Sequence, residues 1–473
     1  MKIPFVGPSD QARSTNASAQ RSVNCYLEMN NASPRAPIAL YGTPGLSLAF
    51  TLGLPGIRAS IQLGTVAIYV SGNGVYKVDS AYAATLLGTI GSYTGPVGIT
   101  SNGVQVLIVD GTGGWLATTT TLTQITDVDF PAGVTSADFL DGYFMVTGDG
   151  TQLFYINETP NVGGDWNGLD FGSAEGAPDN VIAVKADHRE AWMFGAQSIE
   201  IYVNTGNADF PLERSGNAFI EFGCVAGKSI SKIDNTLFWL GRDQNGEGIV
   251  YRANGYTPVR VSTHAIERAM QGYSRIDDAI AFSFQMQGHS FYALSFPTGD
   301  ATWLFDISSG AWTEWLWRDP SDNTLHRHRA ANHLLFNGVH LVGDWETGDV
   351  YALDMDTYTD NGDPILRLRA TQTLEAEQER VFVSSLQVDM ETGVGLATGQ
   401  GSTPELMLRY SLDGGHSWSN LRTASVGAVG AYGTRALFRR LGQGRNRVWE
   451  ISMTDPVKFA VFGAFADVKR GTS

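Results

Sequence analysis

One short turn motif in this sequence has residue types and a spacing that are more specific for a chemical role than those of any other segment. It reads Ser411-x-Asp413-x-Gly415-x-Ser417-Trp418. An Asp carboxylate in such a position can accept backbone N–H bonds within the turn, and Gly permits a positive φ. Trp418 would pack beneath the turn. The motif therefore predicts a hairpin turn that supports folding, with no catalytic role.

This spacing is similar to the Asp-box, a hairpin turn of sialidases and other β-propellers. A sialidase would carry several such turns, and this sequence has one. It would also need an arginine triad, which often opens with Arg-Ile-Pro, where this chain has Lys2-Ile3-Pro4. No nucleophile, acid and base can be assigned together, so we expect that the chain is not an enzyme.

Four histidines lie close together, at His326, His328, His333 and His340. On a strand, His326 and His328 would share one face, which is a geometry that a metal ion can use. No acidic or cysteine ligand follows at a suitable spacing, and the intervening arginines would repel a cation. We expect hydrogen-bonded or solvated histidines, with no metal site and no cofactor.

Four tryptophans, Trp303, Trp312, Trp315 and Trp317, precede these histidines. Trp315 and Trp317 would lie on one face of a strand, where they could form a carbohydrate platform or a subunit contact. Packing between blades is the interpretation that we favour, because aromatic side chains mostly serve burial.

A basic segment without any Asp or Glu extends from Arg422 to Val448. On a strand, Arg435 and Arg439 would share one face and Arg440 would take the other. Part of the segment is expected to be solvated or paired within a sheet. The remainder could bind an acidic partner or a phosphate. The candidate partner contacts are Arg422, Arg435, Arg439, Arg440, Arg445 and Arg447.

The elements that must position these residues are short strands joined by Gly turns. The turn Ser71-Gly-Asn-Gly74 separates two apolar runs, and its Asn-Gly pair suits a tight hairpin. A related apolar-Tyr core follows a Gly-bearing turn in three places, at Val75–Asp79, Ile249–Arg252 and Val350–Asp354. Roughly 300 residues contain short strands with these irregularly spaced similarities, which indicates a β-propeller rather than a sandwich.

We therefore predict an all-β protein that consists of a β-propeller and an additional antiparallel β domain. Residues 1–40 lack a clear period and contain four prolines, which predicts an extended arm with at most one short strand near 23–27. Residues 41–360 would form the propeller body, with one helix from Thr263 to about Gln271. After a turn-rich boundary near 360–364, residues 361–473 would form the second β unit, which contains the Asp-box. This unit would act as a platform or close the ring of blades.

Composition narrows the classes of function. The formal charge of −16 argues against wrapping DNA or coating an acidic membrane, since both would repel the chain. Cys25 and Cys224 cannot form a disulfide framework or a zinc cluster, so we expect free thiols in a reducing compartment. No apolar stretch reaches the ~18 residues of a membrane-spanning segment. The polar stretch from Met1 to Gln20 does not predict Sec export.

A set of ordered segments carries a family resemblance. The longest reads Gly195-Ala-Gln-Ser-Ile-Glu-Ile-Tyr-Val-Asn-Thr-Gly206, and the others are 21–26, 41–45, 209–216, 220–226, 237–241, 250–256, 261–267, 288–292, 303–306 and 441–456. Their order and spacing resemble the tail nozzle proteins of short-tailed bacteriophages, which are also described as packaged-DNA stabilisation or tail hub proteins. The resemblance extends over nearly the whole chain, and it assigns no catalytic residues.

The resemblance implies a virion component made in the host cytoplasm. Copies of the chain, six in number, would form a ring below the portal and the adaptor (the head-to-tail connector), retain packaged DNA and extend its channel. Genomic DNA would pass through the lumen without sequence-specific binding, which suits a wall that repels DNA. A needle or plug would close the far end, and tail fibres or spikes would attach at the side. The alternative is a carbohydrate-binding or glycan-cleaving, sialidase-like propeller that acts as a receptor-binding tail protein.

Overall fold

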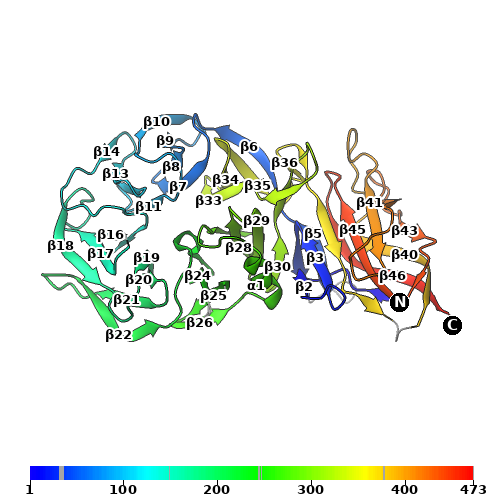
Figure 1. Ribbon diagram of the computed structural model, residues 1–473. Coiled ribbons are helices and arrows are strands. Elements are labelled where there is room, and N and C mark those ends of the chain that lie inside the picture. Colours follow the sequence, from blue (N-terminus) through cyan, green and yellow to red (C-terminus); the bar gives the residue numbers. More distant parts are fainter. Residues whose placement is uncertain (31–36, 149, 243–245, 247, 376–378, 472–473) are drawn as a thin grey trace.

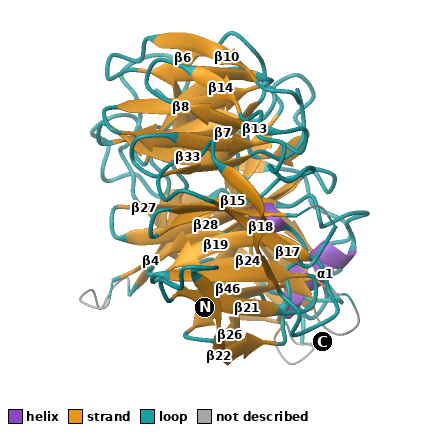
Figure 2. Ribbon diagram, turned by 90° about the vertical axis from the view of Figure 1, so that its left-hand side faces the viewer, coloured by secondary structure: helices purple, strands orange, loops and turns teal. Residues whose placement is uncertain are grey.

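The computed structural model describes residues 1–30, 37–148, 150–242, 246, 248–375 and 379–471. Strands make up nearly all regular structure in these residues (Figure 2), and α1 (His264–Gln271) is the single α-helix among them. The helix confirms the predicted one, with Thr263 at the N-cap position. Ile266 and Met270 of α1 are buried in an interblade core. The predicted all-β class is confirmed.

Seven four-stranded antiparallel blades surround a common axis (Figure 1). Five blades are separate sheets, and two are four-stranded runs within larger sheets. Blades one to three consist of β7 (Ile57–Leu63), β8 (Val66–Ser71), β9 (Gly74–Val78) and β10 (Ala84–Thr89); β11 (Gly98–Ser101), β12 (Val106–Val109), β13 (Gly114–Ala117) and β14 (Leu122–Gln124); and β15 (Ala137–Leu140), β16 (Tyr143–Thr147), β17 (Leu153–Asn157) and β18 (Trp166–Ser173). Blades four and five consist of β19 (Val181–Asp187), β20 (Glu190–Gly195), β21 (Ile199–Asn204) and β22 (Leu212–Ile220), and of β23 (Ser231–Ile233), β24 (Thr236–Arg242), β25 (Gly248–Asn254) and β26 (Thr257–Arg260).

The last two blades connect the ring to the rest of the chain. They consist of β27 (Ile280–Met286), β28 (His289–Phe296), β29 (Ala301–Asp306) and β30 (Ala311–Glu314), and of β33 (Ala330–Phe336), β34 (Val339–Asp344), β35 (Asp349–Asp354) and β6 (Gly45–Thr51). The short hairpin β31 (Leu316–Arg318) and β32 (Leu325–Arg327) joins these blades. Because β6 comes from the N-terminal end and pairs with β35, it closes the ring, and the C-terminal unit supplies no blade.

A separate apolar core fills each junction between neighbouring blades. Between blades one and two, Val70 and Val75 face Val106 and Trp115. Between blades seven and one, Phe336 packs near the strands of the first blade. The remaining five junctions have equivalent buried clusters. Burial of these faces on both sides explains why the blade strands are apolar over most of their length.

The second unit is a β-sandwich. One sheet has the order β4 (Cys25–Met29), β5 (Ile38–Gly42), β46 (Ala460–Arg470), β40 (Val381–Met390) and β43 (Ala436–Arg439), with β1 (Lys2–Ile3) on β46 and β44 (Gln443–Gly444) on β40. The other has the order β3 (Ala19–Val23), β38 (Arg367–Ala370), β45 (Asn446–Met453), β41 (Glu405–Ser411) and β42 (Arg422–Ser425), with β2 (Asp10–Gln11) on β3 and β39 (Leu374–Glu375) on β45. The hairpin β36 (Thr359–Asp360) and β37 (Asp363–Pro364) lies before β38, at the predicted boundary.

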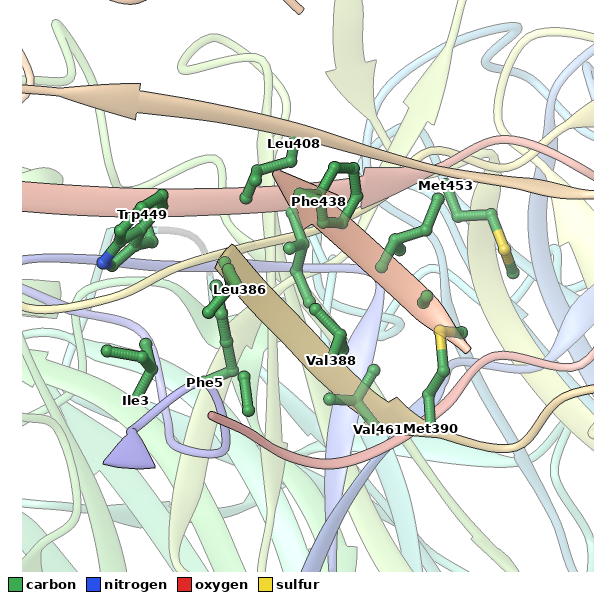
Figure 3. Packing of buried hydrophobic residues seen from close by; sticks show 14 of the residues in the cluster. Ile3, Phe5, Leu386, Val388, Met390, Leu408, Phe438, Trp449, Met453 and Val461 are labelled. Carbon is green, nitrogen blue, oxygen red and sulfur yellow. The ribbon is translucent and has the colours of Figure 1, made fainter. Parts of the chain in front are cut away.

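The N-terminal segment is part of this sandwich, which differs from the extended arm that we predicted. Its described residues form five strands, and Lys2 pairs with Phe465 while Arg21 pairs with Ala370. Ile3 and Phe5 lie in the sandwich core beside Leu386, as Figure 3 shows. These strands are buried by pairing with strands from the far end of the chain. Their sequence therefore lacks the local alternation that would have distinguished a strand from an extended arm.

Candidate functional site

The Asp-box forms a closed hydrogen-bonded turn after β41. The Ser411 hydroxyl donates to Asp413 Oδ1 at 2.6 Å and accepts the Gly415 N–H at 2.8 Å. Asp413 also accepts the Ser417 N–H at 2.8 Å and the Ser417 hydroxyl at 2.5 Å. These bonds, led by that from Ser411, hold the pKa of Asp413 below its usual range. Gly415 has φ +96°, which only a residue without Cβ adopts easily.

This turn lies on the sandwich, in the chain's second β unit. A Cβ on Gly414 would lie 1.9 Å from Asn16 Oδ1, so the turn packs closely against the N-terminal segment. Trp418 is partly buried against a small cluster that includes Ala19 and Val448. The guanidinium of Arg409 lies 4.6 Å from the centre of the Trp418 ring. The turn therefore joins the two ends of the chain, and its own polar groups are used within it.

Most arginines of the basic segment lie at or beyond the ends of short strands, whereas Arg447 lies on β45. Arg422 begins β42 and Arg439 ends β43, whereas Arg435 precedes β43. Arg440 has φ +58°, so the extended backbone stops there. The predicted alternation of Arg435, Arg439 and Arg440 on two faces is therefore wrong, because two of the three lie outside the strand.

Three arginines gather where the edges of the two sheets meet. Arg422 Nη1 donates to the Arg439 carbonyl at 3.0 Å, which links β42 to β43. The Arg440 N–H donates to the Ser384 carbonyl at 2.8 Å, which fixes the backbone directly after β43. All three side chains are exposed, and none forms an ion pair with a carboxylate in the part of the chain that the structure describes. We call Arg422, Arg439 and Arg440 the edge arginines.

The other candidate arginines have different surroundings. Arg435 and Arg445 are exposed at either side of this edge. Arg447 is only 6% exposed, and its guanidinium lies 4.6 Å and 4.8 Å from the ring centres of Tyr410 and Trp449. Burial lowers the pKa of Arg447. Arg447 thus belongs to the interior, and sequence alone gave no signal to separate it from its exposed neighbours.

Two family models match the chain, and the border between them lies near the β36–β37 hairpin. One, described as Bacteriophage P22 Gp10, β-propeller, matches residues 1–358, and another, described as Bacteriophage P22 Gp10, β-sandwich, matches residues 367–469. The chain belongs to the P22 Gp10 phage stabilisation family. This confirms the resemblance inferred from the ordered segments. It identifies the chain as a structural protein of a bacteriophage tail.

Similarities between this Gp10 family member and solved structures are low in sequence identity and in TM-score. The WD40 β-propeller domain of Doa1 is 11% identical, with a TM-score of 0.40 over 65% of this chain and 96% of that one. A catalytically inactive virginiamycin B lyase from Staphylococcus aureus is 10% identical, with a TM-score of 0.43 over 66% of this chain and 99% of that one. A search of curated proteins found no match.

The four histidines of this Gp10 family member have separate partners. His326 Nδ1 lies 2.7 Å from an Asp300 oxygen, and His333 Nε2 lies 2.9 Å from His340 Nδ1. His328 is buried and stacks on Trp315 at 3.7 Å, and its burial lowers its pKa to about 3. No group of three or more His, Cys, Asp or Glu side chains among the described residues is arranged to hold a metal ion.

The tryptophans pack inside the protein. Trp303, Trp312 and Trp315 are buried, and Trp317 lies beneath the Arg329 guanidinium at 4.8 Å. A flat platform for a sugar is therefore not formed by Trp315 and Trp317. No helix in the described ranges is long and apolar enough to cross a bilayer.

Three cations on the propeller axis escaped the sequence analysis. Arg58 lies on β7, Lys185 on β19, and Lys228 on the 3-10 helix η1 (Gly227–Ser229) between blades four and five. All three line one central cavity. Alignment of the innermost strands of successive blades would have found Arg58 and Lys185, but the repeat was too irregular to align them by sequence.

Proposed function

We propose that this chain is the nozzle or hub protein of a phage tail. Six copies form a ring that extends the DNA channel below the portal and adaptor, retains the packaged DNA, and anchors the needle together with tail fibres or spikes. Family membership over both the propeller and the sandwich carries this proposal. No catalytic role is part of it, since the motif that resembled a sialidase turn uses its polar groups internally.

The edge arginines support a contact with another subunit. They are exposed cations in a chain of net charge −16, and their segment contains no acidic residue. Cations held without ion pairs at a sheet edge attract the acidic surface of a neighbouring copy or of the adaptor. The edge arginines therefore form one side of the proposed ring or adaptor interface.

The overall acidity supports passage of DNA. A ring of copies that each carry −16 presents a repulsive wall to phosphates, so DNA can be held in the channel without tight binding. Non-specific retention then depends on closure of the far end rather than on grip along the wall.

The proposal is tested with the double variant Arg439→Gln/Arg440→Asn. Asn is used at position 440 because it tolerates the positive φ found there. The matched control is Arg275→Gln/Arg189→Asn, which also removes two exposed cations, one of them at a position with φ +64°. Native mass spectrometry and electron microscopy would measure ring assembly, and attachment to DNA-filled heads would be measured at low and high salt.

We expect wild type and control to form rings and to attach, and the edge variant to lose one or both properties. Added salt should weaken attachment less in the edge variant than in wild type, since salt screens exposed charge contacts. Normal assembly, attachment and DNA retention in the edge variant would contradict the arginine interface. A wild-type chain that neither forms rings nor joins adaptor complexes would contradict the nozzle role itself.

A further inference from the structure

The propeller encloses a cavity on its axis. This cavity has a volume of about 340 Å³ and adjoins a second one of about 480 Å³. Both are bordered by Arg58, Val97, Ser136 and Lys228, and we call the two cavities together the axial channel. The channel is large enough for a small molecule.

The charge in the first part of the channel is of one sign. Arg58, Lys185 and Lys228 line it together with His333, and no carboxylate belongs to its described lining. Burial holds the pKa of His333 at about 4, so this imidazole is neutral. A wall lined by cations and no carboxylate is unexpected in a chain with 48 acidic and 32 basic residues.

The second part of the channel also has carboxylates in its lining. Besides Arg58 and Lys228, Arg275 and Arg327 border it, and so do Asp277 and Asp278. Arg275 and Asp277 pair with one another at 2.6 Å. Carboxylates therefore border the second part of the channel, whereas the charged residues in the described lining of the first part are all cations.

Lys228 has no anionic partner among the residues that the structure describes. Its ammonium donates one hydrogen bond, to the Val97 carbonyl at 2.5 Å, and an ammonium has three donors. Burial first, and then repulsion from Lys185 and Arg58, lower the pKa of Lys228 to about 7. The folded protein thus holds a lysine whose charged form would be stabilised by any anion placed beside it.

The neighbouring cations differ in how far their hydrogen-bond donors are already used. Arg58 is fixed by five hydrogen bonds to neutral oxygens of residues 72, 92, 94 and 95. Lys185 pairs with Asp138 at 3.2 Å and its side chain remains one-third exposed. In the lining of the same cavity, Asn332 Nδ2 and Ser60 Oγ are buried without a hydrogen-bond partner. Both groups could donate a hydrogen bond to an anion.

We propose that this channel binds a compact oxyanion, of the phosphate or carboxylate class, against Lys228 and Lys185. Arg58 contributes a fixed charge behind the site, because its own donors are already used. Binding restores the full charge of Lys228 and supplies the acceptor that its remaining donors lack. The site is independent of the ring interface, since it lies within one propeller.

Isothermal titration calorimetry with inorganic phosphate and with citrate, at pH 6.5 and low salt, tests this proposal. We expect binding to the wild type, with an affinity that falls as the pH rises through 7 to 8.5 and Lys228 loses its proton. Lys228→Met should weaken binding by about tenfold or more, as loss of a charge-assisted hydrogen bond implies. Lys77→Met, a lysine on β9 outside the channel, should bind as the wild type does. The two ligands separate a phosphate site from a carboxylate site.

Chemical labelling keeps the test decisive if Lys228→Met does not fold. An amine-reactive reagent applied to the wild type near pH 7 should modify Lys228, and phosphate or citrate should protect it, as read by peptide mass spectrometry. Absence of binding by both anions at about 10 mM, far above ordinary ligand affinities, would overturn the proposal. Equal affinity in Lys228→Met and wild type, or labelling of Lys228 that neither anion reduces, would also overturn it.

Discussion

Arg21 and Glu314 form a two-bond ion pair that fastens the sandwich to the sixth blade. Arg21 Nε and Nη2 each donate to a different Glu314 oxygen at 2.8 Å. Arg21 lies on β3 and Glu314 on β30, and these strands also meet in a parallel bridge from Val23 to Glu314. The sheet of a blade thereby continues into the second unit.

Arg21→Met keeps the side-chain stem and removes these donors. We expect the free energy of unfolding of the sandwich to fall by about 1–3 kcal/mol, because Glu314 is mostly buried and loses a charge-assisted partner. Calorimetry should show the unfolding transitions of the two units moving apart. The control is Arg275→Met, whose pair with Asp277 is more than half exposed, and it should have a much smaller effect on stability. Equal effects of both variants would contradict a joining role for Arg21.

A pH-dependent contact lies at the same joint. His289 on β28 contacts Asp306 at 3.0 Å and Glu28, on β4 of the sandwich, at 2.8 Å. The bond to Asp306, followed by that to Glu28, raises the pKa of His289 above its ordinary value. Its stabilising contribution is therefore fully present below pH ~6.5 and is lost as pH rises through the folded-state pKa.

His289→Gln should accordingly lower the melting temperature at pH 6, and the difference from wild type should narrow at pH 9. The exposed His416→Gln is the control and should show no such pH dependence. Melting curves of the three proteins at both pH values would measure this. A difference between His289→Gln and wild type that stays constant with pH would mean that the imidazole is neutral in the fold.

The Asp-box turn depends on glycine at position 415. Gly415→Ala should destabilise the sandwich by about 1–2 kcal/mol, since its φ of +96° is strained for a residue with Cβ. The space itself is adequate, because the added Cβ would be 3.8 Å from its nearest neighbours. Gly433→Ala has open space and no positive φ, so it should be neutral or slightly stabilising. Denaturant unfolding that ranks the two variants equally would show that φ is not the cause.

Both thiols should resist modification in the native protein. Cys25 lies in the sandwich core and Cys224 in the core between blades four and five, and both are free. Burial raises the pKa of each thiol to about 12, which leaves almost no thiolate at neutral pH. Alkylation without reductant should modify both only after denaturation, as mass spectrometry would show. A linked Cys25–Cys224 peptide would contradict this.

The propeller was predictable because its signal is local. The three apolar-Tyr echoes noticed in the sequence fall on β9, β25 and β35, each the third strand of its blade. Equivalent packing demands in equivalent strands produced the same residue pattern, even though the spacing between blades varies. The helix was local too, and it was found within one residue.

The sandwich was predicted only in part, because its strands pair with strands that are far away in the sequence. Gln20 accepts a hydrogen bond from buried Arg369, 349 residues away, and no local period reports such a contact. The same limit applies to the basic segment. Its composition marked the edge arginines, but only three-dimensional packing shows that Arg447 is buried and that Arg440 lies just beyond the end of a strand.

The sandwich is built from both ends of the chain, so its strands are made at different times during synthesis. The ribosome delivers β1 to β5 first, then every blade, and only then the strands from β38 to β46 that β1 and β3 require. The propeller already holds its closing strand β6 when β35 emerges, so it can complete its ring during translation. The edges of β1 and β3 that pair with β46 and β38 stay open until those later strands have been made. The sandwich therefore cannot be completed before the propeller strands have been synthesised.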